Sequence, residues 1–207
     1  MSTYATYSVL DLLDRFSSSE PIPAGGSAAA LTGAVGAALL LMVASIGKSR
    51  TGTPEEGASL ARATSQIRPL RDTLVDLIDR DSAAYQAVLA AFRLPRNNEA
   101  EEARRLEAVD AAMHGATDVP LDTMRACRQA LALARTVADA GYRVAASDVY
   151  VGTELLLAAL RGAARNVDEN TGHLRDAEYT ARVRTERRRL EDEAAADAAS
   201  ARSSLAR

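Results

Sequence analysis

The stretch from Ala28 to Ile46 carries no charged side chain and consists mainly of alanine, glycine and leucine. Such a segment must either be buried or cross a membrane, because about 20 apolar residues are enough to span a bilayer. Alanine and glycine are only weakly hydrophobic, however, and no belt of tryptophan or tyrosine flanks the run. Charged residues at positions 11, 14 and 15 interrupt the apolar residues that a signal peptide would need. The run therefore predicts a central helix buried in a soluble protein, with no membrane partner.

The composition of the whole chain points to helices and to a single domain. Its 207 residues are rich in alanine, leucine, arginine and glutamate, while aromatic residues make up only 4% and tryptophan is absent. Strands favour β-branched and aromatic side chains, so this balance predicts an all-α, single-domain bundle with long helices. The net charge of -3 gives no electrostatic case for binding nucleic acid. The lone Cys127 excludes an internal disulfide and fits a reducing, cytoplasmic location.

Prolines, glycines and polar caps mark where the helices should begin and end. Ser27 is expected to cap the central helix, Pro69 to kink or break a later one, and Pro120 to begin another, since proline suits a first turn but not a helix interior. Residues 1–180 form the predicted domain, and the highly charged segment 181–207 forms a helix that packs on it or extends from it. We expect helices over residues 5–18, 27–46, 54–93, 99–116, 120–140, 147–165 and 175–206.

Small residues at the start of the central helix and along one of its sides indicate ligand binding or close helix packing. In the Gly25-Gly26-Ser27 turn, two glycines let a ligand approach the main chain, and the helix N-terminus that follows offers unpaired N–H groups to an anion. The alternative is a flexible turn with a serine cap. Further along, Ala29, Gly33 and Ala37 form a stripe of small residues at four-residue spacing. Another helix, from this chain or from a second subunit, could approach closely there.

Asp81 interrupts an apolar helix face. Leu77, Ile78 and Tyr85 lie three or four residues from it, the spacing that places side chains on one side of a helix. Burying a carboxylate is costly unless it is paired, and desolvation raises its pKa toward the range useful for general acid–base catalysis. The alternative reading is a structural ion pair with an arginine. Asp81 is therefore the candidate catalytic residue, with the ion pair left open.

The remaining polar candidates are less specific. Ser147 and Asp148 fit either the first turn of a helix or a binding site. Asn166 and Asn170, four residues apart, could orient a polar ligand or cap a helix end. The two histidines, at positions 114 and 173, lack a partner at the spacing of a metal site or catalytic triad, so we interpret both as surface residues. The sequence has no metal-ligand pattern, and no metal is expected.

Five short motifs follow one another over about residues 8–180, and it is their order that is informative. The motifs are Pro23-Ala24-Gly25-Gly26-Ser27 with Met42-Val43, Asp81-Ser82-Ala83-Ala84-Tyr85 with Leu94-Pro95, Val119-Pro120-Leu121, Ser147-Asp148-Val149 and Asn166-Val167-Asp168-Glu169-Asn170. The ordered set resembles the cyclodeaminase/cyclohydrolase family, which comprises formiminotetrahydrofolate cyclodeaminase and methenyltetrahydrofolate cyclohydrolase.

The resemblance implies a homodimeric helical bundle that binds a tetrahydrofolate derivative as substrate or one-carbon donor. A cyclohydrolase adds water to the cationic methenyl bridge and opens the ring to 10-formyltetrahydrofolate, whereas a cyclodeaminase closes a ring and releases ammonia. Both reactions need a carboxylate that moves protons beside an amidinium-like cation, and the resemblance gives this role to Asp81. The residues that it places against the substrate are Gly25, Gly26, Ser27, Tyr85, Tyr142, Ser147, Asp148 and Asn166.

The chain departs from the family pattern close to the expected site. Ala24 replaces a glycine, and Ser45 stands where asparagine is usual. Gly141-Tyr142-Arg143-Val144 replaces Gly-Asn-x-Asn, and the segment 47–51 is altered as well. These departures motivate two alternatives to the cyclohydrolase reaction. One is a paralogue that hands the folate-borne carbon to another nucleophile in a Mannich-like or cyclising step, and the other is a non-catalytic helical dimer that binds folate or a partner protein.

Overall fold

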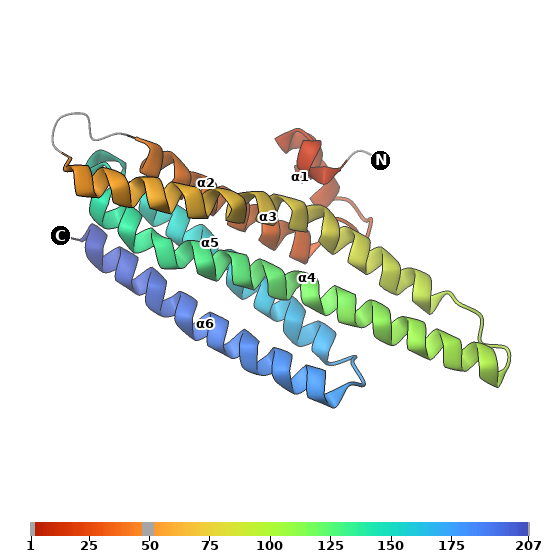
Figure 1. The fold of residues 1–207 in the computed structure, drawn as a ribbon. Helices are drawn as coiled ribbons and strands as arrows, with labels where there is room; N and C mark the ends of the chain where they lie inside the picture. Colours follow the sequence, from red (N-terminus) through yellow and green to blue (C-terminus); the bar gives the residue numbers. More distant parts are fainter. Residues whose placement is uncertain (1–2, 47–51, 207) are drawn as a thin grey trace.

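The computed structural model describes residues 3–46 and 52–206, and these residues are helical without a β-strand, which confirms the all-α prediction. Five long helices, α2 to α6, lie side by side, and the short α1 lies outside them (Figure 1). The elements are η1 (Tyr4–Thr6), α1 (Val9–Phe16), α2 (Gly25–Ser45), α3 (Pro54–Phe92), α4 (Glu99–Ala140), η2 (Arg143–Ala145), α5 (Ala146–Thr171) and α6 (Ala177–Leu205).

Polar caps fix the starts of three long helices. Thr53 and Glu56 form a reciprocal capping box at the start of α3. Asn98 accepts a hydrogen bond from the first turn of α4, and Asp176 does the same for α6. Each cap satisfies N–H groups that have no partner inside the helix. The local sequence therefore sets where these helices begin.

α2 packs between α3 and α5 and supplies many of the buried core residues, but it is not enclosed on all sides, contrary to what the uncharged run predicts. Its length and mean hydropathy of 2.0 would suffice to cross a membrane, and 56% of that stretch is buried among the other helices. The small-residue stripe is filled from within this chain. A Cβ added to Gly33 would lie 2.8 Å from the sulfur of Cys127, and one added to Gly36 would lie 2.8 Å from the carbonyl oxygen of Gly152. One side of α2 stays open, however, where Val35 is 46% exposed.

α4 contradicts the expectation of two helices over residues 99–116 and 120–140, because it continues unbroken through Pro120. Proline has no N–H group, so the carbonyl oxygen of Ala116, four residues earlier, loses its partner in the helix. The side chain of Asn170 on α5 donates a hydrogen bond to that oxygen at 2.7 Å. A contact distant in the sequence thus replaces the missing local bond. α3 likewise continues through Pro69 without ending there.

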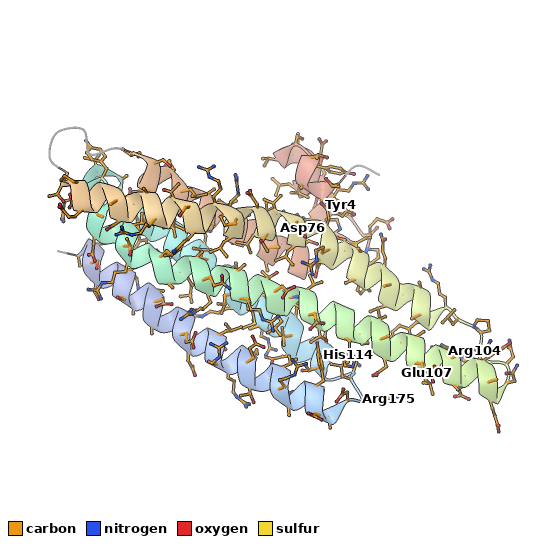
Figure 2. All side chains as sticks on the ribbon, viewed as in Figure 1. Tyr4, Asp76, Arg104, Glu107, His114 and Arg175 are labelled. Atoms are coloured by element: carbon orange, nitrogen blue, oxygen red, sulfur yellow. The ribbon has the colours of Figure 1, made fainter. Side chains whose placement is uncertain are left out.

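The hairpin of α3 and α4 extends beyond the neighbouring ends of α2 and α5 (Figure 1). α6 covers α4 and α5 and is joined to α4 by a bidentate pair between Arg125 and Glu186, with nitrogen–oxygen distances of 2.9 and 2.8 Å. His114 of α4 lies near Arg175, which belongs to the turn between α5 and α6 (Figure 2). Its ring packs on that of Tyr179, 4.2 Å between centroids, so this histidine, predicted to lie at the surface, is only partly exposed, at 28% of its side chain.

Candidate functional site

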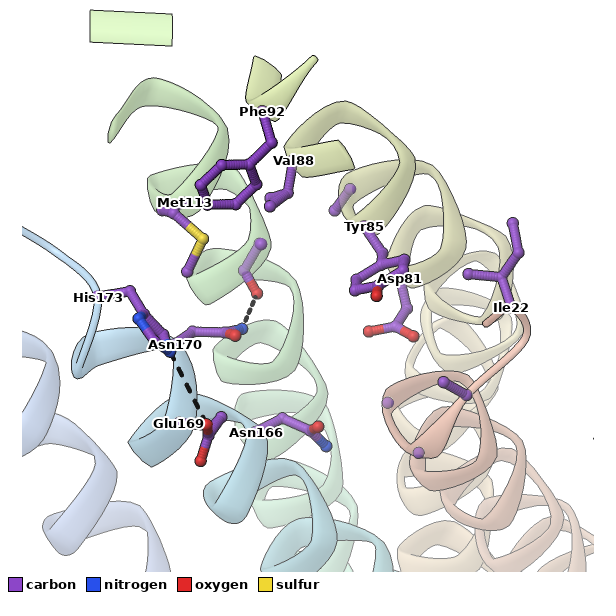
Figure 3. A pocket seen from close by; sticks show the side chains of 15 residues that line it. Ile22, Asp81, Tyr85, Val88, Phe92, Met113, Asn166, Glu169, Asn170 and His173 are labelled. Carbon is purple, nitrogen blue, oxygen red and sulfur yellow. Dashed lines mark hydrogen bonds and ion pairs between the residues drawn. The ribbon is translucent and has the colours of Figure 1, made fainter. Parts of the chain in front are cut away.

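A cavity of about 370 Å³ lies where the extended hairpin rises past the start of α2 and the end of α5 (Figure 3). Its volume falls in the range of small-molecule sites. Most of its surface is apolar, and a few polar side chains converge on it. The lining residues are Ile22, Ala24, Gly25, Gly26, Asp81, Ala84, Tyr85, Val88, Phe92, Met113, Ala116, Asn166, Glu169, Asn170 and His173.

Asp81 projects from α3 into this cavity and is anchored by the first turn of α2 (Figure 3). Its Oδ2 accepts hydrogen bonds from the backbone N–H of Ser27 at 2.8 Å and from the Ser27 hydroxyl at 3.0 Å. The carboxylate lies directly over Gly26, since a Cβ added there would be 2.5 Å from the Asp81 Cγ. Gly26 is therefore required by close approach, and the ion pair with an arginine left open above is replaced by these bonds to Ser27.

Ser27 does not cap α2, which corrects the sequence prediction. The helix begins at Gly25 with Ala24 as its cap residue, so Ser27 occupies the third helical position. Its fully buried hydroxyl lies 2.9 Å from the carbonyl oxygen of Ile78 and 3.2 Å from the hydroxyl of Ser82. Because these partners belong to α3, Ser27 ties the two helices together and orients Asp81.

Burial raises the pKa of Asp81 above that of an exposed aspartate, although both hydrogen bonds from Ser27 act in the opposite direction. A carboxylate held this way has one oxygen engaged by fixed donors and the other available to a ligand. Its negative charge faces a largely apolar space, where it interacts strongly with a positive charge. The arrangement suits a base that attracts a cation and accepts a proton from a reacting group beside it.

The opposite wall comes from the last turns of α5. Asn166 points toward the α2 turn, and Asn170 lies one helical turn further, beside Met113 (Figure 3). His173 lies at the rim with its side chain 64% exposed and its Nε2 3.8 Å from Glu169. Reasoning from the sequence placed Asn166 in the site and missed the apolar lining and the histidine. The four-residue spacing of the two asparagines was the available signal for Asn170.

The structure places Gly25, Gly26, Asp81, Tyr85 and Asn166 in the cavity lining, and their contact with a substrate stays a prediction. Ser27, also expected to contact the substrate, is fully buried behind Asp81 and does not line the cavity. Tyr142, Ser147 and Asp148 lie far from these residues. Ser147 and Asp148 are in the first turn of α5, and Ser147 is not its cap, because the helix begins at Ala146. At 1.5 Å per residue, Ser147 is about 28 Å along α5 from Asn166. Tyr142 is 42% exposed and borders η2 at that same distant end. Within one chain these three residues do not reach the cavity.

Three further expectations from the sequence concern the segment that follows α2, a metal site and Ser45. The altered segment 47–51 lies outside the described residues, so its relation to the cavity stays a prediction. Over residues 3–46 and 52–206 no group of three or more histidine, cysteine, aspartate or glutamate side chains is placed to hold a metal ion. Ser45 is exposed at the last position of α2, at the end away from the cavity.

Comparisons with known proteins agree on one family. The profile of formiminotransferase-cyclodeaminase matches residues 8–189. The methenyltetrahydrofolate cyclohydrolase of Methylorubrum extorquens is 40% identical over 167 residues, covering 81% of this chain and 80% of that protein. The formimidoyltransferase-cyclodeaminase of Gallus gallus is 28% identical over 76% of this chain, which spans only 29% of that protein. The crystal structure of formiminotetrahydrofolate cyclodeaminase from Thermotoga maritima has the same fold, with a TM-score of 0.86 over 97% of this chain and 96% of that one, at 22% identity.

Proposed function

Because the chain belongs to the formiminotransferase-cyclodeaminase family, we propose that it is a folate one-carbon enzyme of the cyclohydrolase type. It adds water to the methenyl bridge of 5,10-methenyltetrahydrofolate and releases 10-formyltetrahydrofolate. The similarity to the cyclohydrolase of Methylorubrum extorquens, 40% against 28% for the Gallus gallus protein, favours this reaction over cyclodeamination. The resemblance in motif order leads to the same reaction.

The observation that carries the proposal is the Asp81 carboxylate, held by Ser27 on one side of an otherwise apolar cavity. The methenyl bridge shares a positive charge between two nitrogens, so a fixed negative charge beside it stabilises the bound cation. The same carboxylate can accept a proton from the water that attacks the bridge carbon. One group thus supplies both requirements of the reaction.

The proton balance gives Asp81 two steps. As the water oxygen bonds to the bridge carbon, one water proton moves to Asp81 and the substrate cation becomes a neutral carbinol. The bond from this carbon to the pterin nitrogen then breaks, the nitrogen keeps the electron pair, and Asp81 returns the proton to it. The carbinol hydroxyl loses its proton as the formyl C=O forms, and this is the proton that the reaction releases overall.

Loss of the near-ultraviolet absorbance of methenyltetrahydrofolate tests the function directly. The purified protein is expected to accelerate this loss at least a hundredfold over buffer, the lower bound of general-base catalysis. Tight binding without acceleration would support the non-catalytic folate-binding dimer. Acceleration only when an amine or carbon nucleophile is added would support the paralogue. The observation that favours this alternative is that Tyr142 and Val144, which depart from the family pattern, are exposed. A protein that neither binds nor converts the folate would contradict the proposal.

We propose further that the enzyme is a homodimer whose interface is the outer side of α2 and α5. α2 contains no charged residue, and Val35, Met42 and Val151 remain 41–46% exposed. A contiguous apolar surface of this kind marks an interaction site in most proteins. A second copy of the chain suits it, because an uncharged apolar surface is complementary to itself in a two-fold contact.

On α5, the residues that adjoin this surface are spaced symmetrically about the centre of the row that they form. Positions 147, 151, 155, 158, 162 and 166 share one side of the helix, while Glu154 on another side pairs with α6. An antiparallel pairing with the same helix of a second copy, centred between Leu155 and Ala158, sets Ser147 against the second copy's Asn166. This arrangement carries the Ser147-Asp148 motif of one subunit to the cavity of the other.

The same two-fold axis suits α2. Val35 lies at the middle of Gly25–Ser45, and the open positions on either side of it are symmetric. Gly25 lies beside Asn166 of α5, and Gly36 lies against the backbone of Gly152, so the two helix midpoints fall at the same level of the bundle. A single axis can therefore serve both helices, and this supports a site that the Ser147-Asp148 motif of the second copy completes.

Val35→Arg should separate the subunits, since it sets two arginines against each other at the proposed axis. We expect a monomer by size-exclusion chromatography with light scattering, and a loss of activity of about tenfold or more because the Ser147-Asp148 motif leaves the cavity. Ala132→Arg, which also adds a charge at an exposed position but on α4, is the matched control and should change neither. A fully active monomer of the Val35 variant would contradict the shared site.

A further inference from the structure

The carbonyl oxygen of Ala116 has no partner within α4. That partner would be the N–H of residue 120, and Pro120 has none. The side-chain amide nitrogen of Asn170 donates to this oxygen instead, at 2.7 Å (Figure 3). Because a backbone carbonyl can only accept, the bond also fixes which end of the Asn170 amide faces α4. The carbonyl end of the amide is left for the cavity.

Asn166 is held in a similar way. Its Nδ2 donates to the carbonyl oxygen of Gly162 at 3.1 Å, and its Oδ1 lies 4.0 Å from where a Cβ on Gly25 would stand, so it adjoins the start of α2. Both amides therefore direct a nitrogen to the backbone and offer carbonyl oxygens to a ligand. Asp81 offers carboxylate oxygens from the other wall (Figure 3). The inner walls thus favour a ligand with N–H donors and a positive charge.

Asn170 lies at the end of the cavity formed by Val88, Phe92 and Met113. Val88 and Met113 are only 7% and 5% exposed, so this end of the cavity presents apolar surface that is shielded from solvent and suits the faces of a flat ring. N–H groups on the edge of such a ring must find acceptors, since an unpaired buried donor is costly. Asn170 is the polar side chain fixed at this end, and Asp81 is occupied by the one-carbon bridge.

We propose that Asn170 is a specificity-determining residue whose side-chain oxygen accepts a hydrogen bond from the 2-amino group of the pterin ring, and that Pro120 is the positioning residue that holds it there. The inference rests on the proposed function, since it concerns a folate in the same cavity. A neutral amide accepts this hydrogen bond without placing a charge beside the ring, and the other carboxylate of the lining, Glu169, is 80% exposed and lies beside His173 at the rim. The motif of Val119-Pro120-Leu121 is thereby linked to that of Asn166 to Asn170.

A thermodynamic cycle between protein and ligand tests the role of Asn170. Calorimetry would compare tetrahydrofolate with its 2-desamino-2-methyl analogue on wild type and on Asn170→Leu, with the exposed Gln129→Leu as control. Loss of the amine should weaken binding to wild type about tenfold, and the Asn170 variant should bind both ligands equally, at the weaker level. Additive losses, or a cycle in which Asp81→Asn couples to the amine instead, would overturn the assignment.

The outcomes separate this inference from the proposed function. If wild type binds neither ligand, the proposed function fails and the inference falls with it. If wild type binds tetrahydrofolate and Asn170→Leu keeps its preference for the amine, only the inference fails. Asn170→Ser, which keeps a donor beside the helix but removes the amide oxygen, gives the same readout should the leucine variant not fold.

Pro120→Ala tests the positioning role. The new N–H competes for the carbonyl oxygen of Ala116 and releases the amide of Asn170. We expect a melting temperature equal to or above that of wild type, together with a several-fold weaker affinity for tetrahydrofolate and a smaller preference for the amine. Adding this change to Asn170→Leu should weaken binding no further. Unchanged discrimination, or a variant that fails to fold, would refute the positioning role.

Discussion

Asp81→Asn is expected to lower kcat/KM for methenyltetrahydrofolate hydrolysis by about three orders of magnitude. The amide keeps the shape of the side chain and can still accept hydrogen bonds from Ser27. It can neither accept a proton from water nor hold a negative charge beside the cation. The rate at which methenyltetrahydrofolate loses its absorbance, measured at saturating and at limiting substrate, gives kcat and kcat/KM for both proteins. A decrease of less than about threefold would exclude Asp81 as the base.

Stability measurements distinguish lost chemistry from lost structure in this variant. Because burial raises the folded-state pKa of Asp81, its ionised form is disfavoured in the folded protein. The stability linked to this group is fully present below the unfolded pKa and is lost as pH rises through the folded pKa. At neutral pH, Asp81→Asn should therefore not lower the melting temperature. Asp76→Asn, on an exposed acid of the same helix, is the matched control and should leave activity unchanged.

The pH profile of the wild-type enzyme should show the same group. If Asp81 is the base, kcat/KM falls as pH drops through its raised pKa, because the protonated acid cannot accept a proton. The midpoint should lie above the ordinary aspartate pKa of about 3.9. The limb should disappear in Asp81→Asn. A rate independent of pH across this range would assign proton transfer to another group.

The sequence predicts the parts of this site that depend on local pattern. Three- and four-residue spacing places Asp81 on an apolar helix face, and the Gly25-Gly26 turn marks a backbone that another group approaches. It does not predict that these two features meet, because Ser27 reads equally well as a helix cap. Only the packing of α2 on α3 directs the Ser27 hydroxyl to Ile78 and Asp81. Local propensity was overridden by a tertiary hydrogen bond.

Where the structure differs from the sequence predictions, the cause is again a contact between residues that are distant in the sequence. Pro120 has the local character of a helix start, and the helix survives because Asn170, fifty residues later, supplies the missing hydrogen bond. The apolar end of the cavity forms because the α3–α4 hairpin extends past the other helices. The local sequence around Phe92 or Met113 does not predict this extension. Ser147 lies far from the cavity because α5 is long and the two are at its opposite ends. The role predicted for Ser147 in the site therefore depends on a second copy of the chain.

Gly26→Ala should reduce activity about a hundredfold or more, through Asp81 and without removing any functional group. The added methyl group would overlap Oδ1 of Asp81 and stand 2.5 Å from its Cγ, closer than real contacts allow. Either Asp81 rotates away from Ser27 or α2 shifts from α3, and both displace the carboxylate from the cavity. Overpacking of this kind also costs stability, about 1–3 kcal/mol.

Gly57→Ala is the matched control, because it lies in α3 with nothing within 4 Å of an added Cβ. Replacing a helical glycine by alanine in open space stabilises the helix, by up to about 1 kcal/mol, and should leave kcat/KM unchanged. Activity and thermal unfolding measured together separate the two cases. If Gly26→Ala retained full activity, activity would not depend on the close approach of the Asp81 carboxylate to the α2 backbone, and the role proposed for Asp81 and Ser27 would be wrong.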